Sequence, residues 1–147
     1  MLSIFQITFV YIDSVDRELA TNQTYFTKTL LDFEKLKVTY IMEDGRTESD
    51  CKEIKLSNYR WASSLSIEEY KSILKKCSFL IGNSSSGIHE AATYKKAVIN
   101  IGSRQNRRLK SFNVLNANYN HKEIKKKIDI CLKNIFFKEN LKKVKNL

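Results

Sequence analysis

The chain has 147 residues, of which 42% are hydrophobic and 29% charged, and its formal net charge is +10. This length suits one domain, residues 1–147, with a modest core, and it is too short for two full nucleotide-binding α/β domains. No stretch approaches the 18 or more apolar residues of a membrane span, so we expect no membrane partner.

The first half of the chain alternates between strand and helix patterns. The apolar residues 2–10 predict a strand rather than a signal peptide, because no basic leader precedes them and acidic residues follow. Residues 17–36 show helical spacing of large apolar side chains, and residues 37–42 predict a second strand. After a turn at Asp44-Gly45, a weakly patterned stretch to residue 58 indicates a helix and then a short strand.

The next helix has a defined start. Ser66 and Glu69 have the spacing of a capping box, in which each side chain accepts a hydrogen bond from the other residue's backbone N–H. Apolar residues continue at helical spacing to about Cys77, so the sequence predicts a helix from Ser66 to that point.

Residues 78–104 hold three of the four glycines of this proline-free chain, in a strand, Ser/Gly loop, helix, strand pattern. The first strand stops at Gly82, and the serines at 84–86 precede a helical pattern that opens near Ile88. Unpaired first-turn N–H groups and the helix dipole favour an anion there, and Gly87 would let the backbone approach it. A phosphate site is thus one explanation, but the local pattern alone favours an ordinary serine N-cap, because serine leads N-cap preferences.

Residues 121–147 form a basic C-terminal helix and tail, with nine lysines against three acidic residues. Apolar side chains recur at helical spacing at Ile124, Ile128, Cys131, Leu132 and Ile135. The lysines at 122, 125, 126 and 133 then occupy solvated faces. Arginine and aromatic residues do not interleave with these lysines, so nucleic acid is an unlikely partner, although a polyanion could be attracted at low salt.

Strands alternating with helices predict a parallel sheet covered on both sides, a three-layer α/β fold. Three scattered cysteines, Cys51, Cys77 and Cys131, argue against a disulfide framework or a zinc site and favour the cytoplasm. His89 and His121 lack partners at metal-ligand spacing, so we predict no metal. Neither a Gly-x-Ser-x-Gly elbow nor the Lys-Ser/Thr ending of a P-loop occurs.

One segment carries a family resemblance. It comprises Gly82-Asn83-Ser84-Ser85-Ser86-Gly87-Ile88, Glu90-Ala91, Val98-Ile99-Asn100-Ile101-Gly102, Arg104-Gln105 and Asn113-Val114. These residues resemble the UDP-N-acetylglucosamine 2-epimerase family, especially hydrolysing members that feed sialic-acid-type amino sugar synthesis. The resemblance implies a Rossmann-like domain equivalent to the C-terminal half of a GT-B-type two-domain enzyme.

The resemblance also implies a UDP site without cofactor, made of Asn83, Ser84, Ser85, Ser86, Gly87, Glu90 and Arg104. Ser84 and Ser85 would bind the diphosphate, Glu90 the ribose hydroxyls, and Arg104 the nucleotide's negative charge. A carboxylate near a phosphate-binding helix start suits a sugar diol, and a guanidinium suits phosphate. Alternatively, Glu90 complements the helix dipole and Arg104 is a solvated loop charge.

The chain departs from the family in ways that limit its chemistry. The family reads Thr-x-His-Pro where this chain has Thr8-Phe9-Val10-Tyr11. It also reads Arg-Gln-x-Gly-Arg where this chain has Arg104-Gln105-Asn106-Arg107-Arg108, which lacks the glycine. The resemblance places the catalytic acids chiefly in the other domain, and Asp13 and Asp16 lie on a loop of unknown direction. We therefore assign no catalytic residue to this chain.

Three functions follow as alternatives. The first is the UDP-binding half of a hydrolysing UDP-N-acetylglucosamine 2-epimerase, which converts UDP-N-acetylglucosamine to N-acetylmannosamine and UDP. That half would be truncated or would need a separately encoded N-terminal domain, and its uncovered face predicts self-association. The second is a non-catalytic UDP-sugar-binding or regulatory module. The third is a basic interaction domain or glycosyltransferase half outside the family.

Overall fold

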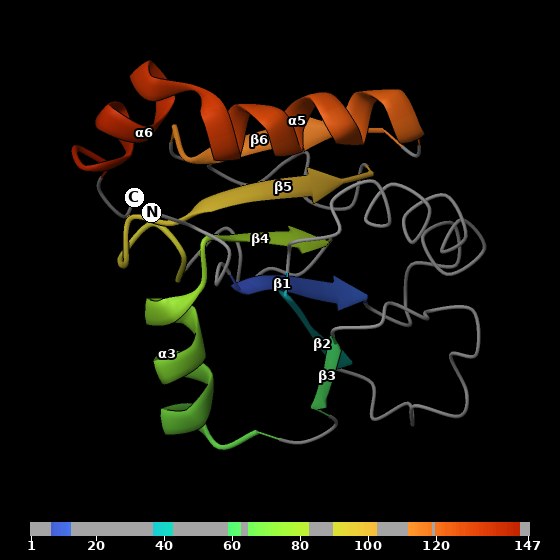
Figure 1. Ribbon diagram of the computed structural model, residues 1–147. Helices are drawn as coiled ribbons and strands as arrows, with labels where there is room; N and C mark the ends of the chain where they lie inside the picture. Colours follow the sequence, from blue (N-terminus) through green and yellow to red (C-terminus); the bar gives the residue numbers. More distant parts are fainter. Residues whose placement is uncertain are drawn as a thin grey trace.

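The computed structural model describes residues 7–12, 37–42, 59–62, 65–82, 90–102, 112–118 and 120–144 (Figure 1). The six strands are β1 Ile7–Ile12, β2 Lys37–Met42, β3 Tyr59–Ala62, β4 Phe79–Gly82, β5 Ala97–Ile101 and β6 Val114–Ala117. The described helices are α3 Ile67–Lys76, α5 His121–Lys133 and α6 Ile135–Leu141.

The six strands form one parallel sheet in the order β3-β2-β1-β4-β5-β6. The chain builds outward from β1 to β3 on one side, and then returns to place β4 on the other side of β1. This reversal between β1 and β4 is a topological switch point of a doubly wound sheet. The structure thus confirms a three-layer, Rossmann-like α/β fold.

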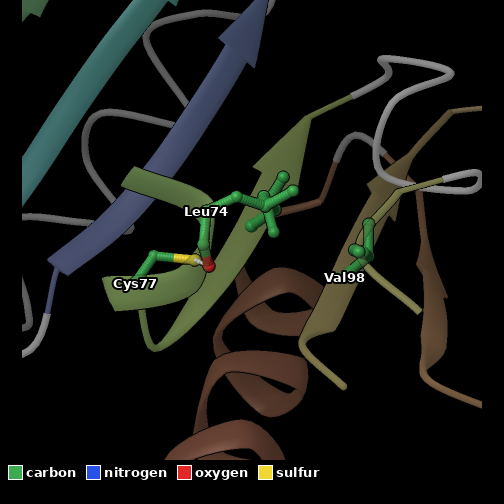
Figure 2. Packing of buried hydrophobic residues seen from close by; sticks show 5 residues of the cluster. Leu74, Cys77 and Val98 are labelled. Atoms are coloured by element: carbon green, nitrogen blue, oxygen red, sulfur yellow. Dashed lines mark hydrogen bonds between the residues drawn. The ribbon is translucent and has the colours of Figure 1, made fainter. Parts of the chain in front are cut away.

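Helix α3 begins where the capping box predicted it. The Glu69 backbone N–H donates to Ser66 Oγ at 3.1 Å, and the Ser66 N–H donates to Glu69 Oε1 at 3.2 Å. The helix packs through Leu74, which is fully buried, and its C-cap Cys77 is buried as well. Figure 2 shows these two residues beside β4, with Val98 on the neighbouring strand.

The central strands β4 and β5 are buried along their whole length. Because side chains alternate between the two faces of a strand, burial at every position means that both faces are covered. Fully buried side chains there include Phe79, Ile81 and Ile99. On the outer side, α5 lies along β5 and β6 (Figure 1) and buries Ile124, Ile128 and Cys131.

The apolar stripe predicted along the basic helix is confirmed up to Cys131 and is wrong at Ile135. Helix α5 ends at Asn134, whose N–H donates to Ile130 O at 3.1 Å. The Asn134 side chain then accepts from the Phe137 N–H at 2.9 Å and starts α6. Asparagine favours this N-cap role, and the break leaves Ile135 73% exposed at the start of α6.

Other sequence expectations have mixed outcomes. The strand at 37–42 has the predicted bounds, and a short strand follows residue 58. Strand β6 was not predicted. The expected helix at 17–36 and the turn at Asp44 lie outside the described residues. Among the described helices, none is long and apolar enough to cross a membrane.

The Ser66 cap makes a measurable contribution to stability. We expect Ser66→Ala to lower the free energy of unfolding by about 1 kcal/mol, because the Glu69 N–H loses its acceptor. Urea unfolding followed by circular dichroism measures this. The matched control is Ser72→Ala at an exposed position inside the same helix, where alanine should be neutral or slightly stabilising. Equal losses in both variants would contradict the prediction.

Candidate functional site

The candidate site lies at the carboxyl edge of the sheet, beside the switch point. Strands β1 and β4 are neighbours there, with Tyr11 opposite Gly82 in the ladder. Ligands of open parallel α/β sheets bind outside the carboxyl ends of the strands at such a point. The Ser/Gly segment follows Gly82 directly in the chain, so it starts at the edge where this rule places a ligand.

Most of the predicted site residues lie outside the described residues: Asn83, Ser84, Ser85, Ser86, Gly87 and Arg104. Glu90 is described and is half-buried. The structure therefore defines the end of β4, which the Ser/Gly segment follows, and the end of β5, which the Arg104 segment follows.

Both of those strand ends are glycines with positive φ. Gly82 ends β4 with a φ of 152°, and Gly102 follows β5 with a φ of 87°. A residue with a Cβ would be strained by of the order of 1–3 kcal/mol in such conformations. The Gly102 N–H also donates to Ala117 O at 2.9 Å, which continues the β5–β6 pairing. These glycines set the directions in which the Ser/Gly segment and the Arg104 segment leave the sheet.

Glu90 lies in a run of consecutive turns at 90–95, in which the Thr93 N–H donates to Glu90 O at 3.1 Å. The start of the helix predicted from Ile88 lies outside the described residues. The run closes with Lys95 at a φ of 57° and with the Lys96 N–H donating to Ala91 O at 2.9 Å. This is the Schellman pattern that ends helices, so the segment stops soon after Glu90.

A lysine in this left-handed conformation has a tertiary contact that holds it. Lys95 Nζ donates to Val144 O at 3.0 Å, across 49 residues of sequence. The left-handed conformation costs a non-glycine residue about 1–2 kcal/mol. The charge-assisted hydrogen bond to a carbonyl offsets part of that cost, and it ties the turn that carries Glu90 to the C-terminal end of the fold.

Two buried asparagines support the sheet around the site, and sequence reasoning quoted them only as part of the family pattern. Asn100 is 2% exposed, stands opposite Gly82 and Asn116 in the ladder, and donates from Nδ2 to Asn116 Oδ1 at 3.0 Å. Asn113 is fully buried and donates from Nδ2 to Lys96 O at 2.8 Å. Its Oδ1 has no hydrogen-bond partner within the described part of the chain. Asn100 thus lies in the same row as the start of the Ser/Gly segment.

The two cysteines that the structure describes are buried thiols. Burial raises the pKa of both the Cys77 and the Cys131 thiols to about 12, so neither is a nucleophile near neutral pH. No cluster of three metal-ligating side chains occurs in the ranges that the structure describes. Val10, where the family has its histidine, lies within β1 opposite Tyr40 and Ile81. Asp13 and Asp16 lie outside the described residues.

Comparison with known proteins identifies the group to which this architecture belongs. The family model described as UDP-N-acetylglucosamine 2-epimerase matches residues 13–147. The polysialic acid biosynthesis protein P7 of Escherichia coli is 36% identical over 101 residues, covering 61% of this chain and 25% of that protein. The GDP/UDP-N,N'-diacetylbacillosamine 2-epimerase (hydrolyzing) of Campylobacter jejuni is 34% identical over 95 residues, covering 65% of this chain and 23% of that protein.

A solved structure shares the fold over nearly the whole chain. The S. aureus MnaA-UDP co-structure superposes with a TM-score of 0.77 at 10% identity, covering 97% of this chain and 40% of that one. The fold is therefore that of one domain of a GT-B-type enzyme. The chain spans about a quarter of the length of the curated relatives that it matches.

The buried thiols give a prediction for chemical labelling. With a pKa of about 12, only about one thiol in 10⁴ is ionised at pH 8, so a disulfide reagent such as DTNB should not react with Cys77 or Cys131 in the folded protein. In a Cys51→Ser variant we expect no labelling without urea and two thiols labelled in urea. Rapid labelling of the folded variant would contradict the burial of these thiols.

The raised pKa values of these two thiols also predict how the free energy of unfolding changes with pH. The folded-state pKa values are raised above 9.0, so the stabilisation from the neutral buried thiols is fully present below pH 9 and is lost as the pH rises toward 12. Cys77→Ala should weaken this loss. A double Cys77→Ala, Cys131→Ala variant should remove the part of the alkaline destabilisation that comes from these thiols.

Proposed function

The chain belongs to the UDP-N-acetylglucosamine 2-epimerase family, and from this premise we propose that it supplies the UDP-binding C-terminal domain of a hydrolysing member. Family membership removes the alternative of an interaction domain or glycosyltransferase half outside the family. The proposal concerns the ligand, the residues that hold it and the reaction of the complete enzyme.

One observation carries the proposal. The Ser/Gly segment starts at Gly82, the last residue of β4, and β4 is the neighbour of β1 at the switch point. Of the two explanations open for the serines, a simple N-cap could follow any strand of the sheet, whereas a phosphate site is expected at the switch point. The position thus favours the phosphate site.

We assign the roles as follows. Backbone N–H groups and hydroxyls of Ser84 and Ser85 bind the diphosphate, with Asn83, Ser86 and Gly87 completing the loop. Arg104, which follows β5 after Gly102, supplies positive charge on the adjacent strand. Glu90 accepts hydrogen bonds from the ribose hydroxyls, and its half-buried position leaves part of the side chain open to a ligand.

The complete enzyme would hydrolyse UDP-N-acetylglucosamine to N-acetylmannosamine and UDP in the cytoplasm, for sialic-acid-type sugar synthesis. The reaction consumes one water, removes UDP from carbon 1 and inverts carbon 2, without nicotinamide or metal. Acidic residues of the other domain would carry the protons, as the family resemblance implies. This chain by itself would bind UDP without turning it over.

A non-catalytic UDP-sugar-binding module is the second candidate. The observation that favours it is Val10, which takes the family's histidine position and is paired on both sides within β1. A valine in the sheet can neither donate nor accept a proton, so the part of the chemistry that this histidine supports in the family would be lost.

Binding of UDP tests the proposed site. We expect Arg104→Ala to weaken UDP binding by roughly ten- to a hundredfold and Ser85→Ala by about fivefold, because a charged ligand loses charge-assisted partners. Isothermal titration calorimetry measures both. Matched controls are Lys71→Ala and Ser72→Ala on the exposed side of α3, which should bind UDP like the unaltered chain. If the control variants lose as much UDP affinity as the site variants, the proposed site is wrong and UDP binds through the overall positive charge of the chain.

Glu90 is tested in the same titration by changing the ligand. If its carboxylate binds the ribose 2′-hydroxyl, the unaltered chain prefers UDP over 2′-deoxy-UDP, and Glu90→Gln loses most of that preference. If the preference survives in the variant, Glu90 serves only the local turn.

Catalysis distinguishes the two candidates. Mixing the chain with the N-terminal domain of a hydrolysing relative should release N-acetylmannosamine from UDP-N-acetylglucosamine, detected by chromatography, if the chain is an enzyme half. UDP binding without product formation, also after Val10→His, would favour the binding module.

A further inference from the structure

Three large apolar side chains near one buried ring are exposed. Phe112 is 54% exposed, Ile135 73% and Phe136 83%, while Phe137, the next residue after Phe136, is buried. The ring centroids of Phe112 and Phe137 lie 5.5 Å apart, which brings Phe112, two residues before β6, against α6. We call Phe112, Ile135 and Phe136 the apolar tip. Grouped exposed apolar side chains with a polar rim typically mark an interaction site.

Exposed lysines continue from the apolar tip along α6 and α5. On α6 and the turn after it, Lys138 and Lys143 are exposed and have no acidic partner within the described residues. On α5, Lys122, Lys126 and Lys133 fall on the side opposite the buried Ile124 and Ile128, by helical spacing. Lys133 approaches Asp129 at 3.6 Å, but both side chains are well exposed, so this pair neutralises little of the face. The sequence from 121 to 147 carries a net charge of +6.

The apolar tip lies at the opposite edge of the sheet from the candidate nucleotide site. Phe112 precedes β6, and in Figure 1 α6 lies at the end where the parallel strands begin, away from their arrowheads. A domain that faces the carboxyl edge across a substrate cleft would therefore leave the tip uncovered. The self-association expected from the sequence also concerned that cleft-facing side.

Charge decides among the remaining occupants. A second copy of this chain would bring an equally positive face against the first, which electrostatic repulsion disfavours. A protein partner of the hot-spot type usually offers pockets for anchors and meets them over a compact patch. Here the lysines extend along two consecutive helices, and the two most exposed apolar residues of the tip are the first two residues of α6. That arrangement fits a broad anionic surface with an apolar layer beneath it.

We propose that α5 and α6 bind the surface of an anionic lipid membrane, with Ile135 and Phe136 entering the boundary between headgroups and acyl chains and the lysines contacting the headgroups. This revises the expectation of no membrane partner, which rested on the lack of a spanning segment. Interfacial binding needs no such segment, because only the apolar face of a helix enters the lipid.

Co-sedimentation of the full chain with vesicles tests the proposal. We expect binding to vesicles of phosphatidylcholine with 30% phosphatidylglycerol and little binding to phosphatidylcholine alone. The double variant Ile135→Ser, Phe136→Ser should weaken binding at least tenfold. Lys126→Gln with Lys138→Gln should weaken it by roughly 25-fold and reduce its salt dependence, since each cation near the surface contributes about a fivefold factor.

Matched controls come from α3 on another part of the molecule. Ile67 is 73% exposed, the same fraction as Ile135, so Ile67→Ser removes equal exposed apolar surface, and Lys71→Gln removes one exposed charge. Both should bind vesicles like the unaltered chain, and circular dichroism should show all variants folded. The proposal is overturned by absent binding to anionic vesicles, or by binding that the Ile135, Phe136 variant retains. It is also overturned if poly-glutamate, but not lipid, is bound in a Phe136-dependent way, which would point to an acidic protein.

Discussion

The reversal of strand order between β1 and β4 is the constraint on which the other features of this molecule depend. Because successive connections leave β1 toward β2 on one side and return to β4 on the other, the chain segments after Ile12 and Gly82 start from neighbouring strands. The arrangement is stable only if β4 and β5 lose water on both faces, which their uninterrupted burial provides. The apolar runs that fill the core thus also determine where a ligand can meet the chain.

Two buried asparagines, Asn100 and Asn113, connect β5 and β6 near the edges of the sheet. Asn113 Nδ2 donates to Lys96 O, and the backbone carbonyl of Asn113 accepts from the Val98 N–H at 2.9 Å. One residue therefore joins the starts of β5 and β6. Near the carboxyl ends of β5 and β6, the side-chain hydrogen bond from Asn100 to Asn116 joins the same two strands. A buried amide is costly in the wrong register, where it loses its partner. These residues therefore favour one alignment of strands that apolar contacts alone would specify less tightly.

The sequence predicts the fold where a local signal and the tertiary structure agree. Ser66 and Glu69 define a helix start without help from the rest of the chain, and the apolar strand at 79–82 can only be buried. Strand β6 escapes prediction because four residues with an exposed Asn116 carry no clear period, and it is the register with β5 that makes them a strand. Ile135 was misplaced because helical spacing continues through Asn134, whereas the cap interrupts the helix.

The candidate site could be located by its resemblance to a family but not by local pattern. Serines before a helical segment look alike whether they cap the helix or hold a phosphate, since both uses satisfy the same N–H groups. Glu90 shows the limit: its surroundings are turns closed at Lys95, and that closure depends on a contact with Val144 that no sequence window contains. The topology adds information that the local pattern lacks. Ligands of such sheets bind at the carboxyl edge beside the switch point, and the segment after Gly82 begins there.

The proposed nucleotide site and the apolar tip would lie at opposite edges of the sheet, separated by the length of its strands. Four residues of β6 separate its start, beside the apolar tip, from the carboxyl edge by about 13 Å. At physiological ionic strength charges are screened over about 8 Å. A nucleotide at one edge and an anionic surface at the other would then interact little, although both gain from the same excess of lysine. With the lysines of α5 contacting headgroups along the helix, the domain would rest on its α5 side, and its carboxyl edge would stay open to the second domain of a GT-B-type enzyme and to a nucleotide sugar.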